Sequence, residues 1–238
     1  MTIIKRYSGA LAALACLAAL SLPASAVVLS NGGFEAGFAG WTRADSLGGD
    51  GTFFIQSGSL SPVNGDPVPP PPGGNNAAMT DAGAGGSHAL YQDFSVASAA
   101  GSYVLSFDLY IANRSGLYSS PATLDWSENF ANQQFRVDIL KDTADPFSVL
   151  AADVLANIYQ TMPGDALETG YTTMNFDVTA LLNGNVGNSL RLRFAEVDNL
   201  GPLQVGIDNV GIAAVPEPAT LPLLLGGVLL LTLLRSRT

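Results

Sequence analysis

Cysteine, histidine and positive charge are all scarce in this chain of 238 residues. It holds one Cys and one His, and its 10 Lys and Arg residues stand against 20 Asp and Glu residues, for a net charge of -10. A single Cys excludes a disulfide framework and any zinc site built from several cysteines. The lack of clustered basic residues excludes nucleic acid as a partner, because neutralising phosphates requires them.

Charge of either sign is also low, whereas apolar residues are abundant. Charged residues make up 13% of the chain and hydrophobic residues 47%, and the usual charged fraction is about 25%. The longest apolar runs lie at the two ends of the chain. The length between them suits one β-rich domain with a substantial core.

Residues 1–26 have the three parts of a secretory signal peptide. Two basic residues are followed by an apolar run over 10–22 and then by the small-residue pattern Ala24-Ser-Ala26, which signal peptidases recognise. We therefore expect the secretion machinery to export the chain and signal peptidase to cleave it after Ala26.

A lipoprotein signal at Cys16 is the alternative reading of this segment. The residue three positions before Cys16 is Ala13, where a leucine is usual, and apolar sequence continues beyond the cysteine. Cleavage after Ala26 leaves a mature protein without cysteine, so its fold must be held by its core and by any metal that it binds.

The C-terminal segment, residues 215–238, has the composition of a short membrane anchor. Residues 219–234 carry no charge, and Arg235 and Arg237 follow them. A helix of this length spans about 24 Å at ~1.5 Å per residue, which makes a short transmembrane segment. The basic end is expected to stay in the cytoplasm, so residues 27–214 would lie outside the inner membrane.

The tripeptide Pro216-Glu217-Pro218 precedes this apolar segment and its basic end. The order of the three parts resembles the PEP-CTERM sorting signal of Gram-negative bacteria. That resemblance implies that an exosortase, a membrane-embedded cysteine protease-transpeptidase, recognises the tripeptide and processes the protein near it. It also implies an inner-membrane-anchored precursor that passes to the cell surface or extracellular matrix. A plain anchor, whose prolines only end a helix, is the alternative.

The region between the two ends shows the period-2 alternation of half-buried β-strands. In 102–111, for example, Tyr103, Leu105 and Phe107 alternate with polar residues. The predicted strands are 52–55, 89–96, 102–111, 134–140, 149–152, 172–178, 189–196 and 204–212, and residues 153–159 fit either a strand or a short helix. We predict an all-β fold, an antiparallel two-sheet jelly-roll sandwich formed by residues 27–214.

Residues 57–78 interrupt this pattern. The segment contains Pro62, Pro67 and the run of prolines at 69–72, followed by two glycines and two asparagines. Prolines favour extended polyproline II and glycines favour coil, so we predict a mobile surface loop within the one domain. A proline-motif ligand for another protein is the alternative.

A second resemblance follows from the order of several short motifs. They are Asn31-Gly-Gly-Phe-Glu35 with Gly40-Trp41, His88 to Phe94, Gly101 to Asp108, and Ile207-Asp208-Asn-Val210. Together they resemble the jelly-roll carbohydrate-binding modules of the galactose-binding-like type. The resemblance implies that the first segment pairs with the last, and that Glu35 and Asp208 hold a structural Ca²⁺, a cation that takes oxygen ligands. The alternative is that Glu35 caps backbone groups and Asp208 lies in a turn without a metal.

No catalytic set can be assembled from the sequence, so we expect a protein that is not an enzyme. His88 follows a glycine-rich turn, which favours an edge or loop position over a catalytic base. A glycosidase needs two carboxyl groups across a cleft, and so acidic a chain contains close pairs without function. Three such pairs are Asp125 with Glu128, Asp142 with Asp145, and Glu196 with Asp198.

Carbohydrate binding requires exposed aromatic rings that stack on a sugar. Trp126 lies in a polar segment, and Tyr110 and Tyr118 lie on a polar strand face or in a turn, so these three are the predicted carbohydrate contacts. Packing of Trp126 onto its own domain is the alternative. Trp41 is assigned to the core behind the first strand.

These patterns together predict an exported, exosortase-sorted surface or matrix protein that associates with extracellular polysaccharide. A structural or adhesive envelope or biofilm protein without a discrete ligand is the first alternative, and a polysaccharide-acting enzyme is the second. Four of the ten basic residues lie in the end segments, which leaves residues 27–218 with a net charge of -14. So acidic a domain favours calcium and neutral glycans over anionic polymers.

Overall fold

The computed structural model describes residues 27 and 29–215. The predicted signal peptide with Ala24 and Ala26, the sorting tripeptide Pro216-Glu217-Pro218 and the apolar segment 219–234 lie outside the described residues. Among the residues that are described, no helix is both long and apolar enough to cross a membrane.

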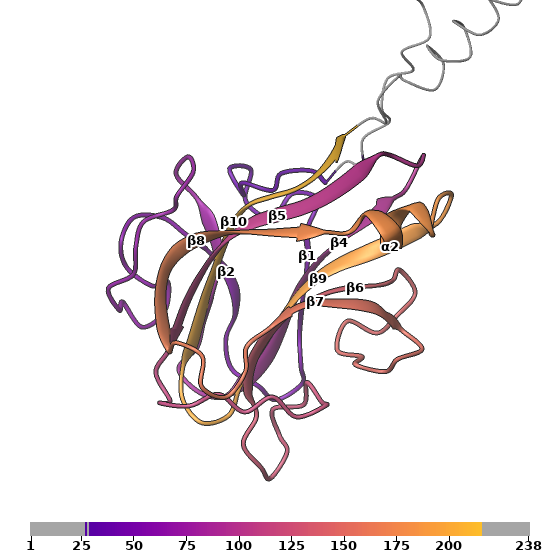
Figure 1. The fold of residues 1–238 in the computed structure, drawn as a ribbon. Helices are drawn as coiled ribbons and strands as arrows, with labels where there is room; N and C mark the ends of the chain where they lie inside the picture. Colours follow the sequence, from indigo (N-terminus) through magenta and orange to yellow (C-terminus); the bar gives the residue numbers. More distant parts are fainter. Residues whose placement is uncertain (1–26, 28, 216–238) are drawn as a thin grey trace, which may run out of the picture.

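The described chain forms two antiparallel five-stranded sheets that pack face to face (Figure 1). Sheet A has the order β1 (Thr42–Asp45), β4 (Gly86–Ser95), β9 (Ser189–Asp198), β6 (Gln133–Lys141) and β7 (Val154–Gln160). Sheet B has the order β2 (Thr52–Gln56), β3 (Ala77–Asp81), β10 (Leu203–Val215), β5 (Ser102–Asn113) and β8 (Glu168–Asp177). A short helix, α2 (Thr179–Asn183), lies at one end of the sandwich (Figure 1). The predicted all-β, two-sheet antiparallel sandwich is confirmed.

The core lies between the inner faces of the two sheets and is rich in aromatic rings. Phe107 of β5 and Phe194 of β9 meet edge to face with their ring centroids 5.3 Å apart, and Trp41 lies 5.9 Å from Phe194. Such pairs add about 0.5–1.5 kcal/mol to the burial of their area. Trp41 is buried, so its predicted place in the core is confirmed.

Three strands differ from the prediction. Residues 149–152 form a loop and a turn, and the strand here is β7, so 153–159 is strand except for Asp153, which lies in the turn. β7 is an edge strand, half-buried along most of its length and paired to β6 with two irregularities, so its sequence lacks alternation. β1 is a four-residue edge strand, and β3 has the sequence AAMTD, which does not alternate between apolar and polar residues and so gives no period-2 signal.

The first and last segments of the described chain lie side by side, as the second resemblance implies. The backbone N–H of Val210 donates to the carbonyl oxygen of Gly32 at 2.9 Å. A Cβ on Gly32 would collide with that Val210 carbonyl, so only glycine permits the approach. Residues 31–35 form turns rather than a strand.

The loop 57–78 is held against the domain at several points. The backbone N–H groups of Val63 and Asn64 donate to Oδ2 of Asp81 at 2.6 and 2.9 Å. Val68 packs with Met79 and Tyr110 on the outer face of sheet B. The last two residues of the predicted loop belong to β3. These contacts oppose the free movement that the composition suggests.

Candidate functional site

Trp126 lies in an open hollow on the outer face of sheet A. The hollow has a volume of about 370 Å³ and is lined by Ser46, Leu47, Thr123, Leu124, Asp125, Trp126, Ser127 and Phe147. The Trp126 side chain is half-buried, and Leu47 is fully exposed. The hollow therefore combines aromatic and apolar surface with hydroxyl and carboxylate groups, which is the combination that stacks on and hydrogen-bonds a sugar.

The backbone around Trp126 is fixed by hydrogen bonds to neighbouring strands. The N–H of Trp126 donates to Oγ of Ser87 at 3.1 Å, and its carbonyl accepts from Nδ2 of Asn199 at 3.2 Å. Leu124, Ala195 and Val197 form a small apolar cluster beneath it. The indole is therefore held in place before any ligand arrives, which lowers the entropy cost of binding.

The structure corrects the prediction for the two tyrosines. Tyr110 is 1% exposed and Tyr118 is 3% exposed, so neither ring offers a face to a sugar. Tyr110 points outward from sheet B, where Val68 covers it, and Tyr118 packs into the main core. Of the three predicted carbohydrate contacts, only Trp126 has an accessible ring.

Glu35 and Asp208 both reach the loop 73–76. Oε1 of Glu35 accepts hydrogen bonds from the N–H groups of Asn75 and Asn76 at 2.8 and 2.9 Å. Oδ2 of Asp208 accepts from the N–H of Gly73 at 3.0 Å. Both carboxylates thus hold the loop by capping its backbone, which is the arrangement expected without a metal.

The electrostatics of Asp208 nonetheless favour a cation. Burial raises the pKa of Asp208 to about 6, against the hydrogen bonds from Asn209 and Gly73, and the charges of Asp108 and Glu35 add to the rise. Oxygen donors of this kind suit Ca²⁺. Calcium at Glu35 and Asp208 therefore stays a prediction.

A second group of polar side chains lies inside the sandwich, at the end opposite α2. His88 on β4 stands directly across the ladder from Glu196 on β9, and Asp198 is two residues further along β9. All three are almost completely buried. The prediction that His88 is an edge or loop residue is therefore wrong, because the strand begins at Gly86 and turns this side chain inward.

Burial favours the protonated form of both acids in this group. It raises the pKa of Glu196 well above its usual range, and the charge of Asp198 adds to the rise. It also raises the pKa of Asp198 to about 7, although hydrogen bonds from Gly86 and Leu203 act in the opposite direction. A carboxyl group without a cation nearby resists ionisation in such a setting.

The alternation of apolar and polar residues in β9 indicates that both acids face the core, a pattern that the prediction for this pair did not include. Leu190, Leu192 and Phe194 point into the core, and residues 196 and 198 continue the same face. Two acids on the apolar face of a strand predict a buried polar group, so Glu196 and Asp198 differ from the incidental carboxylate pairs of so acidic a chain.

Comparisons with known proteins do not assign a function to this chain. The sequence matches no protein-family model and no curated protein. Similar folds include the carbohydrate-binding module TmCBM61 in complex with β-1,4-galactotriose, at 12% identity over 80% of this chain and 99% of that one, with a TM-score of 0.45.

Two further structures show a comparable likeness. The K3 cleaved adhesin domain of Lys-gingipain from Porphyromonas gingivalis w83 has 14% identity over 79% of this chain and 99% of that one, with a TM-score of 0.47. A cyclase from Fischerella sp. TAU in complex with 4-(1H-indol-3-yl)butan-2-one has 20% identity over 82% of this chain and 100% of that one, with a TM-score of 0.46. At TM-scores below 0.5 these likenesses assign no function.

Proposed function

We propose that the protein is an exported surface or matrix protein whose sandwich binds extracellular polysaccharide at the hollow around Trp126, without catalysis. The observation that carries the proposal is the half-buried indole of Trp126 in an open hollow, on a backbone that hydrogen bonds fix and packed against a small apolar cluster. Aromatic rings in such positions stack on the apolar face of a sugar, and neighbouring hydroxyl groups fix its orientation.

The net charge of the domain bears on the class of glycan. Asp125 lines the hollow and is exposed, and residues 27–218 carry a net charge of -14. An anionic polymer would be repelled by this field. We therefore propose a neutral polysaccharide as the ligand.

Export and sorting complete the proposal. Residues 1–26 supply the signal peptide, and Pro216, Glu217 and Pro218 supply the exosortase recognition site ahead of the membrane segment 219–234. The route would run from an inner-membrane-anchored precursor to the cell surface or matrix of a Gram-negative bacterium. A structural Ca²⁺ at Glu35 and Asp208 would hold the loop 73–76 to β10.

A polysaccharide-acting enzyme is the weaker hypothesis, because its best carboxylate pair is inaccessible. Glu196 and Asp198 are 1% and 2% exposed, so a sugar chain cannot reach them. A glycosidase requires its two carboxyl groups to flank the bond that is cleaved.

The test is retardation of the full-length chain, in detergent, on native gels that each contain one neutral or anionic polysaccharide. We expect retardation by one class of neutral glycan, its loss in Trp126→Ala and its partial survival in Trp126→Phe. Phe130→Ala is the matched control, because Phe130 is an exposed aromatic residue that does not line the hollow. Equal retardation of Trp126→Ala and the wild type would refute the site, and self-association without retardation would favour the adhesive alternative.

A further inference from the structure

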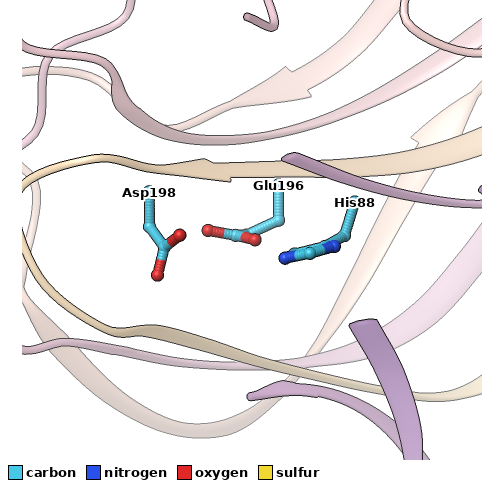
Figure 2. Close-up of side chains that lie close together, drawn as sticks. All are labelled: His88, Glu196 and Asp198. Atoms are coloured by element: carbon cyan, nitrogen blue, oxygen red, sulfur yellow. The ribbon is translucent and has the colours of Figure 1, made fainter. Parts of the chain in front are cut away.

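Three metal-ligating side chains converge inside the sandwich. Among the residues that the structure describes, His88, Glu196 and Asp198 form a group whose ligand atoms all lie within 4.8 Å of one another. Figure 2 shows the imidazole and the two carboxylates pointing toward one another from neighbouring strands. Bonds of about 2.0–2.2 Å to one ion place its ligands roughly 3–4 Å apart, so small side-chain rotations bring all three to a common ion.

We propose that His88, Glu196 and Asp198 bind one divalent transition-metal cation, either Zn²⁺ or Mn²⁺. The site is separate from the Trp126 hollow and from the predicted calcium position at Glu35 and Asp208. The proposal depends neither on polysaccharide binding nor on sorting.

The imidazole is already oriented as a metal ligand. Nδ1 of His88 lies 2.8 Å from Oδ1 of Asp45. In the tautomer that donates from Nδ1 to this carboxylate, Nε2 presents a lone pair. Metal-bound histidines are oriented in this way by a carboxylate behind them.

Two buried atoms of the group lack partners. Within the described part of the chain, neither Nε2 of His88 nor Oε1 of Glu196 has a hydrogen-bond partner. Both residues are 1% exposed, and a buried polar atom without a partner costs about 1–3 kcal/mol. Both atoms belong to the ligand group, so one cation would satisfy both.

Asp198 is fixed by the backbone in the position of a third ligand. The N–H of Gly86 donates to its Oδ1 at 2.8 Å, and the N–H of Leu203 donates to its Oδ2 at 3.3 Å. Each oxygen retains a lone pair for a metal. A Cβ on Gly86 would lie 2.6 Å from Nε2 of His88 and 2.5 Å from the carbonyl oxygen of Asp50, so glycine at this position keeps the space beside Nε2 open.

The donor set selects the class of cation. One imidazole nitrogen and two carboxylates suit Zn²⁺ or Mn²⁺, whereas Ca²⁺ prefers six to eight oxygen ligands. Two carboxylates also balance the charge of a divalent ion, which buried acids require. Asp45, which is 41% exposed at its side chain and lines an open hollow between β1 and β2, connects the group to the surface.

Metal binding is tested by calorimetric titration of the full-length chain, purified without a histidine tag and stripped of metal, with Zn²⁺, Mn²⁺ and Ca²⁺ in separate runs. We expect one equivalent of Zn²⁺ or Mn²⁺ to bind and to raise Tm. Binding should be lost in Glu196→Gln, unchanged in Glu35→Gln and weaker by about 10–100-fold in Asp45→Asn, where only the residue behind the ligand changes. Absence of binding, or equal binding by Glu196→Gln, would overturn the proposal.

A measurement on the wild type tests the metal site even if the variants at buried positions do not fold. His88 is the only histidine in the chain, so an imidazole in the metal's coordination shell identifies this site by itself. X-ray absorption of the Zn²⁺-loaded protein should show one imidazole among oxygen ligands. An all-oxygen shell would place the metal on surface carboxylates and refute the site.

Discussion

The backbone N–H of Trp126 donates a hydrogen bond to Oγ of Ser87 at 3.1 Å. Ser87 points to the outer face of sheet A, and the next residue, His88, points into the sandwich, because successive side chains of a strand alternate. The proposed polysaccharide hollow and the proposed metal site are therefore one residue apart on β4 but on opposite faces of the sheet. Each can be altered without touching the other.

Ser87→Ala tests the support of the indole. The substitution leaves the N–H of Trp126 without its partner, at a cost of about 1–3 kcal/mol if that group stays buried. We expect weaker retardation by polysaccharide than in the wild type but stronger than in Trp126→Ala, with Zn²⁺ binding unchanged. Retardation equal to that of the wild type would mean that the hydrogen bond does not position Trp126.

Asp138→Asn tests the buried ion pairs on the outer face of sheet A. Asp138 and Arg193 are 0% exposed at their side chains, and Arg136 also donates to Asp138, at 2.6 Å. Removing the charge leaves a buried guanidinium uncompensated, for which we expect a loss of about 3–5 kcal/mol in the free energy of unfolding. Asp93→Asn is the control, since Asp93 is 45% exposed and such pairs contribute about 1 kcal/mol or less. Urea unfolding of both variants measures the difference.

The same carboxylate predicts a pH dependence. Burial would raise the pKa of Asp138, but Arg136 and Arg193 hold it below its ordinary value of 3.8. A lowered native pKa contributes stability that is present above the unfolded pKa and lost as pH falls through the native one. Urea unfolding of the wild type should therefore show a loss below about pH 4 that is smaller in Asp138→Asn. Equal losses in the two proteins would contradict this assignment.

Calcium and a chelator test the loop 73–76. We expect Ca²⁺ to raise Tm of the wild type after a chelator has removed all metal, because a cation relieves the repulsion that Asp208 experiences from Asp108 and Glu35. Asp208→Asn should remove the response. If Ca²⁺ leaves Tm of the metal-free protein unchanged while Glu35→Ala lowers it, the two carboxylates act as backbone caps alone.

Substitution of Pro216 and Pro218 by Ala tests the sorting signal. We expect an unprocessed precursor retained in the membrane, because the processing enzyme would no longer recognise the tripeptide, whereas loss of two prolines leaves an apolar anchor intact. Cell fractionation and immunoblotting of the host measure this. Normal release of the double variant would show that the tripeptide only ends a helix.

Much of the fold could be predicted because alternation is a local property. Leu190, Leu192 and Phe194 alternate with polar residues and indicate a strand wherever the rest of the chain lies. β3 could not be found in this way, since its sequence AAMTD has no alternation. β7 was ambiguous because it is an irregular edge strand.

The sequence by itself determined the acidic charge, the two-sheet class and the place of Trp41 in the core, and it predicts the export segments. It also indicated which strand face each side chain occupies, but whether that face is covered depends on residues distant in the chain. Tyr110 is buried because the loop 57–78 brings Val68 over it. His88 and Glu196 meet because β4 pairs directly with β9, although β5 to β8 lie between these two strands in the chain. Only tertiary packing decides which strand faces are covered and which side chains meet, because it joins segments that are distant in the chain and whose local sequences do not specify each other.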